Sequence, residues 1–268
     1  MKYIMFTKHL EGLDVAGIMD ALKSVGVEGA DLCVRPGYPV NPENADTQLP
    51  AAAKQFADEG LSIPLVTTPT SFLDPQDPDV QRVYAACGDA GVANLKVGYW
   101  HWSKEDGGYW ALVDRIRAAL DGFQALSAKH GVRTCLHNHS GTSMGLNSSA
   151  VMNLVKGFDP QHVGVFADPG HLSIVGEPID MALDIVKDYL AVMSFKDMMR
   201  PPGGGTRVVR MGHGFVDWET AVRTLTEMNF DGPVSFHSEY SGEPVDTVID
   251  LARIDVRFIN DLRGKNGE

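Results

Sequence analysis

Short apolar segments, rich in β-branched residues, recur along the chain and alternate with longer segments of a different pattern. Apolar runs of this kind are typical of strands that are buried on both faces, as in a parallel sheet. They begin roughly 25–45 residues apart, which is enough chain for one strand and one helix each. The pattern predicts strands at residues 2–7, 30–34, 62–67, 93–98, 132–137, 163–167, 190–195 and 233–238.

The segments between the predicted strands carry apolar residues at helical spacing. VAGIMDALKSVG at 15–26 shows this spacing and ends in glycine, a common helix terminator. The same periodicity runs through residues 109–131, 218–230 and 245–263. Strands that alternate with helices indicate a parallel sheet, and the length of 268 residues suits one (β/α)8 TIM barrel. We therefore expect a single α/β barrel domain over 1–268.

A doubly wound open sheet is the alternative to a closed barrel. Such sheets usually carry a glycine-rich phosphate-binding turn, GxGxxG, after the first strand. The corresponding turn here reads TKHLEGLDV and lacks this pattern, which favours the barrel. The one glycine-rich stretch, RPPGGGTRVVRMGHG at 200–214, is predicted to be a long loop after the seventh strand. Long loops in compact domains are usually functional or mobile.

Composition narrows the class of protein. A net charge of −12 disfavours nucleic acid and anionic membrane surfaces as partners, and no apolar run approaches the ~20 residues that span a bilayer. The first residues, MKYIMFTKH, lack the apolar core of a signal peptide. Cys33, Cys87 and Cys135 show no CxxC spacing and are expected to be buried, reduced thiols. We expect a cytoplasmic enzyme with a small-molecule substrate, whose outer helices could support a homo-oligomer.

Ligand-type residues gather where the predicted strands end. In a barrel, the C-terminal ends of the strands form the active site. Five of the nine histidines follow apolar runs, and a sixth lies in the glycine-rich loop, a concentration that surface histidines have no reason to show. The six are His101, His137, His139, His171, His237 and, in the loop, His213.

Strand alternation indicates which of these side chains share the barrel lumen, because residues two apart point the same way. Carboxylates there, such as Asp168 and Glu239, are costly to bury unless they are paired or metal-bound. Histidine together with Asp and Glu is the ligand set of a divalent ion such as Mn, Mg, Co, Zn or Fe(II). We therefore predict one divalent metal ion held by His137 and/or His139, Asp168 and Glu239. The pairs expected to share a face are His137 with His139, Ser194 with Lys196, and His237 with Glu239.

Each residue of this set also has a structural explanation when taken alone. His139 could be a hydrogen-bonded core group, and Asp168, followed by Pro and Gly, could shape a turn. Lys196 and Asp197 could form a surface ion pair, and Arg35 before proline could support a loop. Four consecutive strand ends that all carry ligand-type residues are hard to explain by packing.

At these residues the sequence resembles the xylose isomerase-like barrels, also called the sugar phosphate isomerase/epimerase family, over essentially the whole chain. DPGH at 168–171 resembles the Asp-x-x-His of strand six, and FKD at 195–197 resembles the Lys-Asp that ends strand seven. GHGFVDW at 212–218 is similar to the segment that opens the seventh helix, and GPVSFHSEY at 232–240 to strand eight with its ligand glutamate. VRPG at 34–37 and HNHSG resemble one subgroup of mostly unassigned function.

The resemblance implies a sugar isomerase or epimerase, in which a divalent ion, often Mn, holds two oxygens of a hydroxy-ketone while glutamates move a proton. Asp168 takes the position of the ligand aspartate, Glu239 that of the strand-eight glutamate, and His171 that of a histidine that touches substrate. Two positions depart from the family pattern. The strand-five glutamate aligns with His137 and the strand-seven histidine with Ser194, so the two-glutamate mechanism does not carry over unchanged.

These considerations assign candidate roles. Glu239 is the first candidate base for proton transfer through an enediolate, and neutral histidine is suited to move protons near pH 7. The other catalytic candidates are Lys196, His139, His171 and His237. The candidates for substrate binding are Arg35, His101, Trp102, Arg210 and His213, with the basic groups available for a phosphate or carboxylate and Trp102 for the apolar face of a sugar.

Other functions fit the same residues. A metal-dependent lyase or dehydratase of a keto-sugar or keto-inositol would use the same enolate to expel a leaving group. Hydrolysis of abasic DNA is disfavoured by the negative charge and the single ligand cluster. A sugar-binding protein without catalysis would bind saccharides without turnover.

Overall fold

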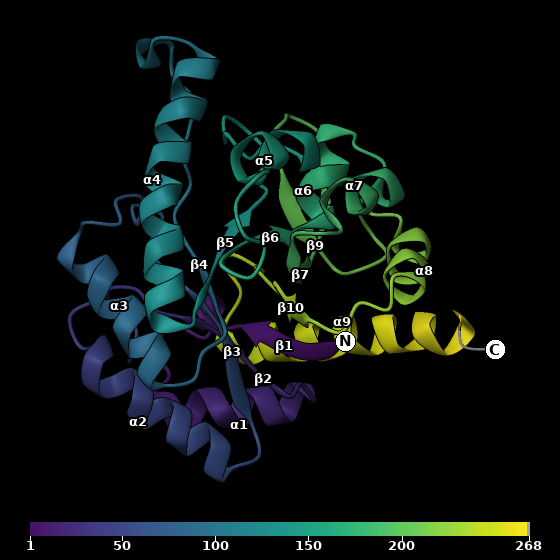
Figure 1. Ribbon diagram of the computed structural model, residues 1–268. Coiled ribbons are helices and arrows are strands. Elements are labelled where there is room, and N and C mark those ends of the chain that lie inside the picture. Colours follow the sequence, from purple (N-terminus) through teal and green to yellow (C-terminus); the bar gives the residue numbers. More distant parts are fainter. Residues whose placement is uncertain (267–268) are drawn as a thin grey trace.

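A computed structural model describes residues 1–266 of the chain. It shows a closed ring of parallel strands surrounded by helices, which confirms the predicted (β/α)8 barrel (Figure 1). Neighbouring strands follow the order β1-β10-β7-β6-β5-β4-β3-β2, and β1 closes the ring by pairing with both β10 and β2. The barrel strands are β1 (Lys2–Phe6), β2 (Gly29–Cys33), β3 (Ser62–Thr67), β4 (Asn94–Lys96), β5 (Arg133–His137), β6 (Val163–Ala167), β7 (Leu190–Phe195) and β10 (Pro233–Phe236).

Helices fill every crossover between successive barrel strands. The helix predicted at 15–26 is α1, which begins where the Asp14 side chain accepts a hydrogen bond from the Gly17 amide (2.8 Å) and ends at Gly26 with φ 85°. Among residues 1–266, no helix is both long and apolar enough to cross a membrane. The helices are α1 (Val15–Val25), α2 (Ala45–Asp58), α3 (Pro78–Asp89), α4 (Tyr109–His130), α5 (Ser148–Val155), α6 (Pro169–Val175), α7 (Ile179–Val186), α8 (Trp218–Glu227) and α9 (Val245–Asn266), with short 3-10 turns η1 (Thr7–His9) and η2 (Lys104–Asp106).

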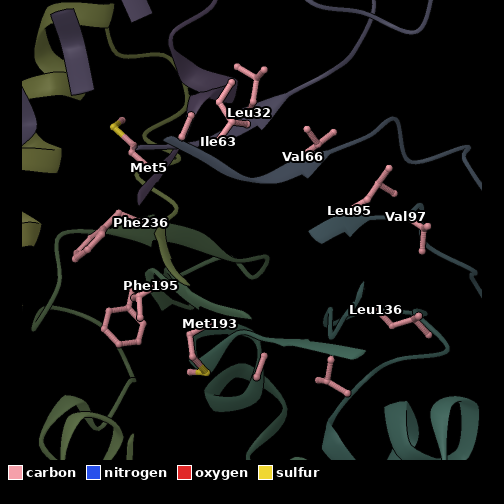
Figure 2. Close-up of a cluster of buried hydrophobic side chains, with 14 of the residues drawn as sticks. Met5, Leu32, Ile63, Val66, Leu95, Val97, Leu136, Met193, Phe195 and Phe236 are labelled. Atoms are coloured by element: carbon pink, nitrogen blue, oxygen red, sulfur yellow. The ribbon is translucent and has the colours of Figure 1, made fainter. Parts of the chain in front are cut away.

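The apolar core has two parts, one on each side of the strands. The larger part lies between strands and helices, and Figure 2 shows side chains such as Leu32, Val66 and Leu136 on the outer side of the ring. The smaller part fills the barrel interior. Because side chains alternate along a strand, each strand supplies both parts. The inner cluster consists of Ile4, Leu65, Cys135, Phe166, Ala191 and Val192, and Cys135 is one of three cysteines that are buried and free, as predicted.

The glycine-rich stretch 200–214 is not wholly a loop, so this part of the prediction was wrong. Arg207–Val209 forms β9, which pairs antiparallel with β8 (Asp197–Met199) directly after the seventh barrel strand. The β-branched residues of β9 favour an extended backbone. The three glycines 203–205 all adopt positive φ and allow the chain to turn between the two strands.

Asp197 fixes the segment that follows this hairpin. Its buried carboxylate accepts hydrogen bonds from the backbone amides of Gly212 (2.9 Å), Gly214 (3.0 Å) and Val216 (3.2 Å), and from the indole of Trp218 (3.1 Å). A Cβ atom at Gly214 would lie 2.1 Å from the carboxylate, so only glycine fits there. Asp197 is therefore a structural anchor for the loop, and not part of a surface ion pair.

We expect Asp197→Asn to lower the free energy of unfolding by about 2–4 kcal/mol, because an amide group replaces one oxygen that several donors share. Urea unfolding followed by circular dichroism measures this change. The matched control is Asp217→Asn at the exposed start of α8, where the side chain caps the helix by accepting from the Thr220 amide. Asn caps helices about as well as Asp, so the control should be near neutral. Equal stability of the two variants would contradict the anchoring role.

Candidate active site

The inner face of the barrel changes from apolar to polar toward the carboxyl ends of the strands. On β5 the inward position changes from Cys135 to His137, and on β7 from Val192 to Ser194. After β6, the inward Phe166 is followed by Asp168. The apolar layer closes the bottom of the barrel, so the polar groups lie at the rim where a (β/α)8 barrel carries its active site.

Asp168 is the centre of this polar layer. The start of α6 holds it, because its Oδ1 accepts from the His171 amide (3.1 Å). Its Oδ2 accepts from Ser194 Oγ (3.0 Å) and lies 3.1 Å from both His137 Nε2 and Lys196 Nζ. Burial alone would raise the pKa of Asp168, but the Lys196 ammonium and the neighbouring histidines hold the pKa well below its ordinary value.

Lys196 joins Asp168 to the second carboxylate, Glu239. Its Nζ lies 3.2 Å from Glu239 Oε1, and Lys8 Nζ lies 2.8 Å from Glu239 Oε2. Burial would lower the pKa of Lys196, but the two carboxylates raise it above its ordinary value. Burial would likewise raise the pKa of Glu239, whereas Lys196, His237 and Lys8 hold it well below its ordinary value. Both carboxylates are therefore ionised at neutral pH, and Lys196 is protonated.

The histidines at the ends of β5 and β6 are neutral, because burial lowers the pKa of each; that of His137 falls to about 3. Hydrogen bonds then fix their tautomers. His171 Nδ1 accepts from the Ser140 amide (3.3 Å), so its Nε2 carries the hydrogen. His139 Nδ1 donates to the Ser140 carbonyl (2.9 Å), which leaves a free lone pair on Nε2. The two imidazole rings lie 3.9 Å apart and present a donor and an acceptor side by side.

A second buried pair, His237 and Asp31, lies on the other side of Glu239. His237 Nε2 is 3.2 Å from Asp31 Oδ2, and the same aspartate accepts from Ser235 (2.9 Å) and Thr67 (2.6 Å). Burial would lower the pKa of His237, but the hydrogen bond to Asp31 and the negative charge of Glu239 raise it. His237 therefore supports Glu239 from β10, although its Nδ1, 3.3 Å from Glu239 Oε1, lacks hydrogen-bond geometry.

Two cavities are lined by these groups and share part of their lining. The inner cavity, about 160 Å³, is lined from β1 to β10 and includes Lys8, Arg35 and Tyr99. The outer cavity, about 630 Å³, extends along the hairpin of β8 and β9. That size is in the range of small-molecule sites. The side chains that line both cavities are His139, Lys196 and Glu239.

The structure separates the predicted substrate contacts into three groups. Arg35 lines the inner cavity, where it also donates to the Thr68 carbonyl (3.1 Å), while Arg210 and His213 line the outer cavity and contact each other (3.2 Å). His101 and Trp102 are exposed and line neither cavity; His101 contacts Thr142 instead. The geometry therefore does not bring this last pair to the site.

Sequence reasoning missed several buried polar groups of the site. Lys96, which is 1% exposed, has its Nζ 3.4 Å from the ring centroid of Tyr99, and its pKa falls well below the ordinary value because of burial and then the charge of Arg35. Lys96 and Asp31 each lie within an apolar strand, at positions that face the lumen. A charged residue inside an apolar run was the signal that could have revealed them. Among residues 1–266, the buried side-chain nitrogens without a hydrogen-bond partner are Lys96 Nζ, His171 Nε2 and His237 Nδ1, and all three lie in this site.

The fold and the polar rim define a (β/α)8 barrel with an enzyme-like cavity at the carboxyl ends of its strands. Residues 19–262 match the family described as xylose isomerase-like TIM barrel, and the chain belongs to this family. The predicted family membership is thereby confirmed.

Solved structures with the same fold include several sugar epimerases. The 3-keto-D-glucoside 4-epimerase from E. coli is 14% identical, with a TM-score of 0.76 over 97% of this chain and 99% of that chain. An L-ribulose 3-epimerase is also 14% identical, with a TM-score of 0.77 over 98% of this chain and 96% of that chain. At such identity, the likeness is one of fold alone.

One curated relative also matches by sequence. An inosose dehydratase from Lactiplantibacillus plantarum is 22% identical over 160 residues. The match covers 54% of this chain and 53% of that protein, so it spans about half the length of the relative.

Members of this family typically depend on a metal, but the side chains here do not fit one. Three of the four predicted ligands, His137, Asp168 and Glu239, lie near one another, and the fourth, His139, lines both cavities together with Glu239. Within residues 1–266, however, no group of three or more His, Cys, Asp or Glu side chains has the arrangement of a metal site. The position between the two carboxylates is taken by the ammonium of Lys196.

Asp255 on α9 supports the segment that carries Glu239. Its carboxylate accepts from Tyr240 Oη (2.6 Å), Ser238 Oγ (3.3 Å) and the Met211 amide (3.1 Å). Burial raises the pKa of Asp255 from 3.8 to about 6, despite these hydrogen bonds. The folded protein therefore binds a proton here over a pH range in which the unfolded chain does not.

We expect this proton to make stability fall as the pH rises from about 4 to about 6, by about 3 kcal/mol, and then level off. Asp255→Asn removes the titrating group, so the difference in unfolding free energy between wild type and variant should change by that amount across the range. Urea unfolding at a series of pH values measures it. Asp250→Asn, on the exposed side of the same helix, is the control and should keep the wild-type pH profile. Parallel profiles of wild type and Asp255→Asn would contradict the assignment.

Proposed function

We propose that the protein is an isomerase or epimerase of a keto-sugar or related polyol, and that it acts by proton transfer next to a carbonyl group through an enediolate. The observation that carries the proposal is the lining that the two cavities share. It consists of an ionised carboxylate, Glu239, an ammonium, Lys196, and a neutral imidazole, His139. A base, a cation for a developing oxyanion and a second proton-transfer group are what enolisation requires.

Glu239 is the proposed base that removes the proton. In the absence of substrate its two oxygens are held by Lys196 and Lys8, which keeps its basicity low. A substrate carbonyl that accepts hydrogen bonds from Lys196 would draw this ammonium away from Glu239. The carboxylate then loses part of its counter-charge and becomes a stronger base at the moment when the carbonyl becomes polarised.

His139 and His171 lie beyond Lys196 in barrel order, because β5 and β6 follow β7 around the ring. The proposed role of His171 is to donate its free Nε2 hydrogen to a substrate oxygen, as a neutral imidazole that stabilises the enediolate. His139, with its free Nε2, is the proposed second group for proton transfer. In an epimerisation, His139 would take a proton from solvent on Nε2 and deliver it to the face of the enediolate opposite Glu239, which returns His139 to its neutral form. Glu239 would then release to solvent the proton that it had removed from the substrate.

The volume of the outer cavity, about 630 Å³, suggests that the substrate extends well beyond the carbon atoms that react. Arg210 and His213 line its far side and could hold a phosphate, a carboxylate or a second sugar unit. The overall charge of −12 favours an uncharged sugar or glycoside. The E. coli neighbour named a 3-keto-D-glucoside 4-epimerase makes 3-keto-glycosides the first substrates to test.

A lyase is the second candidate function, because the sequence match is to an inosose dehydratase. Elimination begins with the same proton abstraction and differs only in the fate of the enolate. The enolate would then expel a β-oxygen, which would leave as water or an alcohol by taking up the proton that Glu239 has removed, while the neighbouring imidazoles would hydrogen-bond the departing oxygen.

We expect Glu239→Gln to slow exchange of the substrate proton next to the carbonyl by about 10²–10⁴-fold, because the amide cannot accept that proton. Incubating 3-keto-glucosides, 2-ketohexoses and inososes with the enzyme in D2O, with detection by NMR, measures the exchange. Glu243→Gln is the matched control, since Glu243 is exposed and lines the same outer cavity. Exchange that survives unchanged in Glu239→Gln would remove Glu239 as the base.

The products of the same incubations separate the candidate functions. An unchanged mass with altered stereochemistry identifies an epimerase or isomerase, whereas loss of water or of an aglycone identifies a lyase. Saccharide binding with neither exchange nor turnover, with or without added divalent metal, would contradict both and leave a sugar-binding protein.

A further inference from the structure

The two carboxylates expected to hold a divalent ion converge on a nitrogen atom of the protein itself. Lys196 Nζ lies 3.1 Å from Asp168 Oδ2 and 3.2 Å from Glu239 Oε1, and the lysine side chain is only 5% exposed. We propose that the Lys196 ammonium replaces the divalent metal ion of the site, so that this chain works without a bound metal. The catalytic role of Lys196 in this inference rests on the proposed function. Metal binding by the protein can be measured independently of any activity.

The carboxylate oxygens that would hold an ion are already engaged by protein donors. Asp168 Oδ2 is contacted by Ser194 Oγ at 3.0 Å and by His137 Nε2 at 3.1 Å, in addition to Lys196. Glu239 Oε2 is held by a second lysine, Lys8, at 2.8 Å. Each oxygen that would face a metal therefore already has a protein donor.

His137, one of the two histidines predicted as ligands, has no free lone pair to offer. Its Nε2 faces Asp168 Oδ2, and because a carboxylate only accepts, this nitrogen carries the hydrogen. Its Nδ1 lies 2.7 Å from Tyr99 Oη, so it accepts the phenol hydrogen. A histidine binds a metal through an unprotonated nitrogen, and both nitrogens of His137 are engaged.

Strand β7 supplies two donors to Asp168 and no metal ligand. Ser194 and Lys196 lie two residues apart and both reach Asp168 Oδ2. The position that the family resemblance gives to a ligand histidine is Ser194, a hydroxyl that donates to the aspartate instead. The strand thus keeps the Lys-Asp ending of the family pattern, but offers Asp168 a hydroxyl donor where that pattern has an imidazole ligand.

The test is a metal titration of the full-length chain after treatment with EDTA. Wild type should bind neither Mn²⁺ nor Co²⁺ stoichiometrically in equilibrium dialysis, and its midpoint of thermal unfolding should not rise with either ion. Lys196→Ala removes the ammonium and leaves two ionised carboxylates facing one another. We expect its affinity for Mn²⁺ to exceed that of wild type by at least about tenfold, since a like charge a few ångströms away is removed.

Lys8→Ala is the matched control, because it also removes one positive charge from Glu239 but leaves Lys196 between the carboxylates. Its affinity for Mn²⁺ should stay close to that of wild type. Circular dichroism confirms that each variant is folded. If Lys196→Ala does not fold, the wild-type titration decides alone: absence of stoichiometric binding supports the inference, and one tightly bound ion per chain overturns it. Equal affinities of wild type and folded Lys196→Ala also overturn it.

Turnover of keto-sugars by the EDTA-treated wild type separates this inference from the proposed function. Turnover that is unchanged by EDTA and by added Mn²⁺ supports both. Turnover that requires Mn²⁺ retains the proposed function and overturns the inference. If no keto-sugar reacts, the proposed function fails, and the dialysis result still decides whether Lys196 replaces the metal.

Discussion

The ion bridge from Asp168 through Lys196 to Glu239 is the interaction on which the site depends. Removing a carboxylate from water costs several kcal/mol unless a charge or hydrogen bonds compensate it. Asp168 is fully buried, and Glu239 lies at the rim of the lumen. Without the ammonium, burial would push both carboxylates toward the protonated form, and the lumen would lose its ionised groups. The bridge therefore sets the protonation states on which any chemistry here rests.

The bridge belongs to a longer polar network that crosses the barrel. From Tyr99 after β4 it passes to His137 on β5 and Asp168 after β6, and from Lys196 after β7 it continues through Glu239 to His237 and Asp31. Each barrel strand from β4 to β7, and then β10, contributes a member at or just after its carboxyl end, and β2 contributes Asp31 from its middle. No segment of the chain contains the site alone, so closing the barrel is also the step that pairs the buried charges. Folding and assembly of the site are thus one event.

The architecture could be read from the sequence because its signals are local. Apolar runs, helical periodicity and turn residues repeat with every strand and helix, so all eight barrel strands were predicted nearly at their observed positions. The location of the site could be read as well, since polar residues after apolar runs must gather at one rim of a barrel. The short strand Arg207–Val209 was missed because its signal, a few β-branched residues after several glycines, is weak.

The chemistry within the site was harder to predict, because it depends on distances across the lumen. The tilt and stagger of the strands set these distances, and neither is encoded in any one segment. The sequence places Lys196 on the same face as Ser194, but not between two carboxylates from other strands. Counting ligand-type residues also overlooks the donors that already engage them, such as the Tyr99 hydroxyl on His137. The inward Lys96 and Asp31 were hidden by their apolar neighbours.

An ammonium and a divalent ion stabilise an enediolate in different ways. A metal offers two charges and can hold two substrate oxygens at once, whereas lysine offers one charge and three directional hydrogens. A site built on lysine must therefore supply further donors for the second oxygen. The neutral His171, with its unpartnered Nε2 hydrogen, and Lys8 on Glu239 are placed to do so. In the proposed mechanism, lysine would hold the base and the substrate oxygen by the same hydrogens, so that polarising the carbonyl and releasing the base would be a single movement of one side chain.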